Sequence, residues 1–237
     1  KLATITEAAL AEGFQVGPTN PLVGLAGRAA LLRRLGETVA ARPEIFALAD
    51  TPRPGGLFDH LAARARNRSL PARDILVALL HHLGPIWPRA QGDCWVHPQL
   101  GQVPLHKLSQ WLAWSLVEPL QQAGITVTDL DALTGLAEYR NGGLFIDLGV
   151  LAPCDPAALQ RPQDVGDPLV VEWRALTVAL LDELAPLVRA RLGVTAENFP
   201  LACLLEGGTW RAGRKAAFAR RPNGAPPLAI VSDGTVF

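Results

Sequence analysis

Two long stretches of the sequence repeat their apolar residues at the spacing of an α-helix, and they restrict the possible folds more than any other feature. The first covers residues 105–123, and its apolar face consists of Leu108, Trp111, Leu112, Leu116 and Leu120. The second covers residues 170–192 and contains Pro186. Shorter helices are expected at 22–36 (ended by Gly36), 57–68, 72–83 and 201–219, with irregular segments at 84–104 and 152–168. The pattern predicts a mainly α fold with a few short strands, organised as a single α-rich domain over residues 1–237.

The composition suits a compact protein that binds a small molecule. Hydrophobic residues make up 49% of the 237 residues and charged residues only 19%, which excludes a disordered chain. Twenty-two basic and 22 acidic residues give a net charge of zero, which argues against binding to a nucleic acid polymer. Most of the basic residues are arginines, whose planar fork of donors fits a carboxylate or a phosphate. Because the chain starts at Lys1 and contains no Met, we expect it to be the C-terminal part of a longer chain.

Several common kinds of site and location have no support in the sequence. The three cysteines lie far apart, and no zinc motif is present, so neither a disulfide framework nor a metal site is expected. Glycine-rich nucleotide loops are also absent, and no cofactor is expected. No signal peptide or membrane-spanning apolar run is found, which predicts a cytoplasmic protein without a membrane partner. The oligomeric state stays open.

The strongest local candidate for chemistry is the segment from Glu138 to Asp147. A carboxylate, a phenol, a guanidinium and an amide follow one another in Glu138, Tyr139, Arg140 and Asn141. We expect a helix to begin near residues 128–131 and to run to about Arg140, with Asn141-Gly142-Gly143 ending it. The glycines would let a ligand approach the backbone. An ordinary helix end with solvent-exposed side chains fits the same residues equally well.

Three further groups of residues are weaker candidates. Glu172 and Arg174 begin the long helix, where Glu172 could simply complement the helix dipole and a buried Arg174 would need a carboxylate partner such as Glu138 or Asp147. Glu206-Gly207-Gly208-Thr209-Trp210, followed by Arg214, places two glycines in a helical stretch, which suggests either a ligand or a tight helix crossing. Asp233 lies in a segment that a plain turn explains more simply.

Six segments together closely resemble the uracil catabolism protein four family, which is catalogued as a domain of unknown function. The segments are FQVGPTNPLVGLAGR (14–28), PLHKLSQWL (104–112), LTGLAEYRNGGLFIDLGVL (133–151), VVEWRALTVALLD (170–182), LEGGTWRAGR (205–214) and SDGTVF (232–237). The resemblance implies a role in a pathway that opens the uracil ring at the nucleotide level. The proposed intermediate of that pathway is a ribosylurea phosphate.

A more distant resemblance suggests a mechanism. The family that cleaves the N-glycosidic bond of queuosine monophosphate carries an Asp-Tyr-Arg at a helix end and a downstream acidic-x-Arg-Ala helix, similar to Glu138-Tyr139-Arg140 and Glu172-Trp173-Arg174-Ala175. That family is all-helical and looks like the helix-hairpin-helix DNA glycosylases, so the resemblance implies a similar helical bundle. This chain departs from it in having Glu138 where that family has Asp.

The two resemblances imply an N-ribosyl hydrolase that takes a small nucleotide-like substrate. Glu138 would face the anomeric carbon, with Asp147 and Glu172 as the other catalytic candidates. Arg140 and Arg174 would bind the phosphate or keep the carboxylates ionised, and Asn141 and Asp147 would bind the ribose hydroxyls. Trp210 would stack on the substrate, and the further substrate contacts are Tyr139, Glu206, Arg214 and Asp233. Two other functions stay open: a non-catalytic partner of another enzyme of the pathway, and hydrolysis of an amide or ureide bond.

Overall fold

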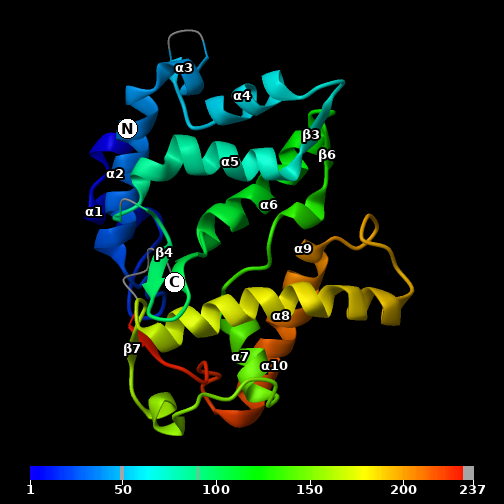
Figure 1. The fold of residues 1–237 in the computed structure, drawn as a ribbon. Coiled ribbons are helices and arrows are strands. Elements are labelled where there is room, and N and C mark those ends of the chain that lie inside the picture. Colours follow the sequence, from blue (N-terminus) through cyan, green and yellow to red (C-terminus); the bar gives the residue numbers. More distant parts are fainter. Residues whose placement is uncertain (49–50, 90, 232–237) are drawn as a thin grey trace. The chain divides into compact units, whose positions relative to one another are not determined.

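The structure, a computed structural model, describes residues 1–48, 51–89 and 91–231 and confirms the prediction of a mainly α fold with short strands (Figure 1). The α-helices are α1 (Glu7–Gly13), α2 (Leu25–Ala41), α3 (Pro43–Phe46), α4 (Gly56–Arg64), α5 (Ala72–Leu83), α6 (Lys107–Gln122), α7 (Tyr139–Asp147), α8 (Pro168–Leu192), α9 (Leu201–Leu204) and α10 (Arg211–Arg220). Short 3₁₀ turns are η1 (Leu2–Thr4), η2 (Gly84–Ile86), η3 (Leu130–Ala132) and η4 (Pro156–Gln160), and η5 (Leu205–Trp210) is a π-helix.

In the described part of the chain, each strand pairs with one other strand to form a two-stranded sheet. They are β1 (Ala47–Leu48), β2 (Thr51–Pro52), β3 (Ser69–Pro71), β4 (Cys94–His97), β5 (Gly101–Pro104), β6 (Thr126–Thr128), β7 (Gln163–Asp164) and β8 (Ile230–Val231). Strands β1 and β2 are antiparallel, as are β4 and β5, whereas β3–β6 and β7–β8 are parallel pairs. The β4–β5 hairpin therefore lies inside the segment that the sequence predicted to be irregular.

The contacts of the chain group its residues into two compact units. Among the described residues, unit 1 holds those within 1–93 and 115–129, and unit 2 holds 94–114 and 130–231. All described candidate site residues belong to unit 2. The organisation of residues 1–237 as a single domain stays a prediction.

In unit 1, the expected end of a helix at Gly36 is wrong, because α2 continues to Ala41. A β-carbon at Gly36 would lie 2.3 Å from the backbone nitrogen of Ala3, so this glycine is needed where α2 meets η1. The prediction for 72–83 is confirmed in α5, whose side chains Ile75 and Leu79 are buried.

Unit 2 is organised around the long helix α8, with α7 packed against α8 and α10 packed against α7 (Figure 1). The prediction of a helix that runs to Arg140 and ends at Asn141-Gly142-Gly143 is wrong, because α7 begins at Tyr139 and contains those residues. Both glycines serve packing. A β-carbon at Gly142 would lie 2.5 Å from Thr177 Oγ1, and one at Gly143 would lie 3.0 Å from the Pro227 ring. The need for glycine at these positions comes from side chains distant in sequence, so local sequence patterns do not reveal it.

The predicted helix at 201–219 is present, but it changes its winding along the way. It starts as α9, widens into the π-helix η5 and continues as α10. Short π-helical turns inside α-helices are rare and occur frequently at functional sites. A β-carbon at Gly207 would have no atom within 4 Å, whereas one at Gly213 would lie 2.0 Å from the carbonyl oxygen of Arg140. The tight helix crossing is thus at Gly213, not at Gly207-Gly208.

Candidate functional site

Glu138 caps the N-terminus of α7. Its backbone is extended, and its Oε2 accepts hydrogen bonds from the backbone N–H of Arg140 at 2.8 Å and of Asn141 at 3.2 Å. A carboxylate in this position satisfies two amides that a helix otherwise leaves unpaired. The Glu-Tyr-Arg segment therefore starts a helix, whereas the sequence analysis placed it at a helix end.

The environment of Glu138 opposes its ionisation. Burial raises the pKa of its carboxyl group, and this effect outweighs the two amide hydrogen bonds and the charges of Lys107 and Arg140, which lower the pKa. A carboxyl group that titrates closer to neutral pH is better suited to accept or give a proton during catalysis. The raised pKa makes Glu138 a candidate for an acid or base.

A cavity of about 410 Å³ lies beside this helix start. Its walls come from the first turns of α6, the start of α7 and the π-helix η5, and consist of Lys107, Trp111, Leu136, Glu138, Asn141, Leu205, Glu206 and Trp210. The cavity combines two carboxylates, one ammonium, one amide and two indoles. Four residues proposed from the sequence meet here: Glu138, Asn141, Glu206 and Trp210.

The side-chain amide of Asn141 has a fixed orientation. Its Oδ1 accepts a hydrogen bond of 3.0 Å from the hydroxyl of Thr209, while its Nδ2 lies 3.5 Å from the carbonyl oxygen of Leu136. Since a carbonyl can only accept, this pairing distinguishes the two ends of the amide. Thr209 is 4% exposed and belongs to η5, so its hydroxyl ties one wall of the cavity to another.

Besides the apolar Leu136 and Leu205, the sequence did not predict three other residues that line or support the cavity. Lys107 and Trp111 lie in the segment 104–112, and Thr209 lies in the segment 205–214. Both segments carry the family resemblance, and this resemblance was the sequence signal that could have identified the three residues. Lys107 is 7% exposed, and its charge lowers the pKa of Glu138, so its ammonium group lies near that carboxylate.

Other predicted residues point elsewhere. Arg140 donates from Nη1 to the carbonyl oxygen of Gly224 at 2.5 Å, and Arg174 is 1% exposed within unit 2. Asp147 forms a two-pronged ion pair with Arg221, at 2.9 and 2.6 Å. It lies nine residues after Glu138, which corresponds to roughly 13 Å along a helix axis. These three side chains do not line the Glu138 cavity.

Tyr139 also lies outside the cavity wall. Its side chain packs against the buried cluster of Val170, Trp173 and Leu228, and the guanidinium carbon of Arg140 lies 4.8 Å from the centre of its ring. Tyr139 therefore anchors the start of α7 to α8. Asp233, the remaining candidate, lies outside the described residues.

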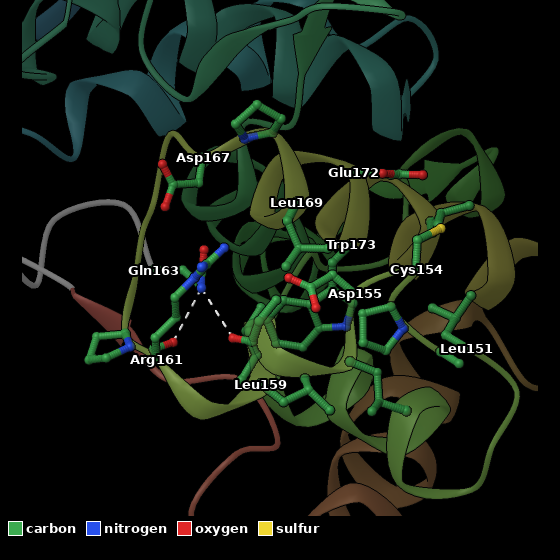
Figure 2. Close-up of a pocket in the computed structure, with 18 residues that line it drawn as sticks. Leu151, Cys154, Asp155, Leu159, Arg161, Gln163, Asp167, Leu169, Glu172 and Trp173 are labelled. Carbon is green, nitrogen blue, oxygen red and sulfur yellow. Dashed lines mark hydrogen bonds between the residues drawn. The ribbon is translucent and has the colours of Figure 1, made fainter.

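Glu172 lines a second cavity of about 550 Å³ between the start of α8 and the segment 151–163 (Figure 2). Trp173 forms part of its apolar floor, and Gln163 is held at its edge by hydrogen bonds from Nε2 to the carbonyl oxygens of Ala158 and Arg161, at 3.1 and 3.3 Å. This cavity is larger but gathers only one of the residues proposed from the sequence. The Glu138 cavity is therefore the better candidate for the active site.

Neither a metal-binding cluster nor a membrane-spanning helix is found among the described residues. No group of three or more His, Cys, Asp or Glu side chains in this part of the chain could hold a metal ion. No helix formed by these residues is long and apolar enough to cross a membrane.

The raised pKa of Glu138 gives a testable pH dependence. Its folded-state pKa lies above the ordinary value of 4.5, so its contribution to stability is complete at lower pH and is lost as pH rises through the folded pKa. The wild-type protein should therefore lose unfolding free energy relative to Glu138→Gln as pH rises above 4.5. Urea denaturation of both proteins from acidic to neutral pH measures this difference. A difference that stays constant, or that grows in favour of the wild type, would contradict the assignment.

The whole chain matches a known protein family, and two known proteins are similar to it. The family described as "Protein of unknown function (DUF1688)" matches residues 1–237. The chain is similar to "Uracil catabolism protein 4" of Lachancea kluyveri, with 37% identity over 278 residues that cover 100% of this chain and 62% of that protein. It is also similar to "Protein urg3" of Schizosaccharomyces pombe, with 39% identity over 248 residues that cover 100% of this chain and 60% of that protein. The chain thus spans about three fifths of the length of these curated relatives.

Proposed function

The chain belongs to the DUF1688 family, and we propose that it acts in uracil catabolism as a hydrolase of the N-glycosidic bond of ribosylurea 5′-phosphate or a related nucleotide. The name of the Lachancea relative supports the pathway. The observation that carries the chemistry is the cavity in which Glu138 and Glu206 lie together beside Asn141 and Lys107. Most enzymes that cleave a glycosidic bond use a pair of carboxylates.

The proposed reaction needs only water and the substrate. The oxygen of a water molecule forms a bond to C1′ of the ribose, and the C1′–N bond breaks with its electron pair moving to the nitrogen. Glu138 takes a proton from the attacking water, and the departing nitrogen receives one from solvent or from the cavity wall. Ribosylurea 5′-phosphate and water give ribose 5-phosphate and urea. The transition state carries positive charge on the ribose ring, which a carboxylate stabilises in a site of low dielectric.

Five residues of the cavity wall have a role in this proposal. Burial makes Glu138 a stronger base than an exposed glutamate, and the amides of α7 hold its carboxylate in one orientation. Glu206 approaches from η5 as the second carboxylate. The oriented amide of Asn141 offers a hydrogen bond to a ribose hydroxyl or to the ureido group. Trp111 and Trp210 supply flat apolar faces for the ligand.

A non-catalytic partner of another pathway enzyme is the alternative function. That function needs an extensive apolar docking face and has no use for ionisable groups collected in a cavity. The ionisable groups of Lys107, Glu138 and Glu206 in this cavity therefore favour the hydrolase. Hydrolysis of an amide or ureide bond lacks an obvious nucleophile and ranks below both.

Turnover of ribosylurea 5′-phosphate by the purified protein tests the proposal. We expect equal amounts of ribose 5-phosphate and urea, measured by mass spectrometry and a urease-coupled assay, at a rate unchanged by EDTA. Substrate that binds without being cleaved would rule out the hydrolase and favour the partner function. Release of ammonia or carbon dioxide in place of urea would assign the protein to amide chemistry.

A further inference from the structure

The Glu138 cavity is a poor place for the phosphate of a nucleotide. Two carboxylates, Glu138 and Glu206, face it, and one ammonium group, Lys107, is the only cation among its lining residues. A dianion placed inside would be repelled by both carboxylates at short range. Arg140 and Arg174, the phosphate ligands suggested from the sequence, do not line the cavity. A phosphorylated substrate must therefore place its anionic end outside these walls.

An exposed basic face begins where the cavity wall ends. Trp210 lines the cavity and is directly followed by α10, which carries Arg211, Arg214 and Lys215 on its exposed surface and contains no acidic residue. The guanidinium carbon of Arg214 lies 5.7 Å from the centre of the Trp210 ring and equally far from that of Phe218. Within the described residues, no carboxylate pairs with Arg214. Its charge is thus positioned by aromatic contacts and available to an anion.

We infer that this face, centred on Arg214 and flanked by Arg211 and Lys215, is a phosphate-binding subsite for the ligand of the Glu138 cavity. The inference rests on the proposed function for the nature of that ligand. Trp210 lines the cavity together with both carboxylates and also contacts Arg214, so a ligand bound against its indole would present its ribose to Glu138 and its phosphate to Arg214. The planar fork of an arginine matches a phosphate better than an ammonium group does.

Calorimetric binding to the Glu138→Gln protein tests the subsite without turnover. The probes are ribosylurea 5′-phosphate and ribosylurea, which differ only in the phosphate group. We expect the phosphorylated probe to bind about tenfold more tightly or better, since a charged hydrogen bond contributes about 1.5–3 kcal/mol. Adding Arg214→Gln should remove this preference and leave the affinity for ribosylurea unchanged. Arg191→Gln, which alters an exposed cation on α8, is the matched control and should have no effect.

The possible outcomes separate the subsite from the proposed function. A preference for phosphate that survives Arg214→Gln, or that depends on Arg140 instead, would overturn the subsite. Loss of the preference with Arg214, together with a wild-type protein that does not cleave the substrate, would support the subsite and reject the hydrolase. If neither probe binds, both proposals are wrong. Arg214-dependent binding of short single-stranded RNA more tightly than of ribosylurea 5′-phosphate would assign the face to nucleic acid and overturn the inference.

Discussion

Replacing Glu138 with glutamine is expected to lower kcat for ribosylurea 5′-phosphate by between about 10² and 10⁴, the usual contribution of a positioned acid or base. Glutamine has the same length and can still accept hydrogen bonds from the amides of Arg140 and Asn141, so the start of α7 should keep its structure. It cannot take a proton from water or balance positive charge on the ribose. The loss should therefore fall on kcat, with KM changed little. Steady-state kinetics of the purified variant measures both.

Two further variants make this result specific. Glu183→Gln removes an exposed carboxylate from α8 and should leave kcat and KM unchanged. Glu138→Asp keeps the charge but shortens the side chain by one methylene, and an intermediate rate is expected. If the Glu138→Gln protein is as active as the wild type while remaining folded, the catalytic assignment of Glu138 is wrong.

Replacing Gly213 with alanine should destabilise unit 2 strongly. The added β-carbon would lie 2.0 Å from the carbonyl oxygen of Arg140, which is backbone and cannot rotate away. Helix α10 and the first turn of α7 would have to separate. Overpacking of this kind costs about 1–3 kcal/mol or more, which exceeds the roughly 1 kcal/mol that alanine gains over glycine in a helix. Urea denaturation at neutral pH gives the change in unfolding free energy.

The matched control for Gly213 is the same substitution at Gly207. A β-carbon there would meet no atom within 4 Å, and Gly207 is exposed on η5. Gly207→Ala should therefore be neutral or slightly stabilising, by up to about 1 kcal/mol. Equal destabilisation by the two substitutions would show that helix winding in η5, and not the contact of α10 with α7, limits stability. The Gly213 variant should also weaken ligand binding, since a shift of Arg140 would move Glu138, which lies two residues earlier at the start of α7.

Helical periodicity correctly predicted the main elements of the fold. Helices α5, α6 and α8 lie within two residues of the ranges expected from their apolar spacing. The errors occurred at glycines. Gly36, Gly142 and Gly143 were predicted to end helices, but each lies inside one. They are glycines because a neighbouring segment leaves little or no room for a β-carbon. Local sequence cannot distinguish a glycine that ends a helix from one that allows close packing.

The candidate site was predictable only in part, for a related reason. Glu138, Asn141, Glu206 and Trp210 meet in one cavity because the start of α7 packs against η5, where Thr209 donates a hydrogen bond to Asn141. The arginines were harder to place from sequence. The partner of Arg140 is the carbonyl of Gly224, 84 residues later, and no local pattern predicts a contact over that separation. Asp147 is likewise paired with Arg221, 74 residues away.

The central claim is that the ribose of a nucleotide-like substrate sits against Glu138 in the cavity at the start of α7. A crystal structure of the Glu138→Gln protein with bound ribosylurea 5′-phosphate tests this claim most directly. We expect C1′ within contact distance of the residue 138 side chain, the ureido group between Trp111 and Trp210, and the phosphate beside Arg214. Substrate bound in the second cavity at Glu172, or with C1′ turned away from residue 138, would contradict it.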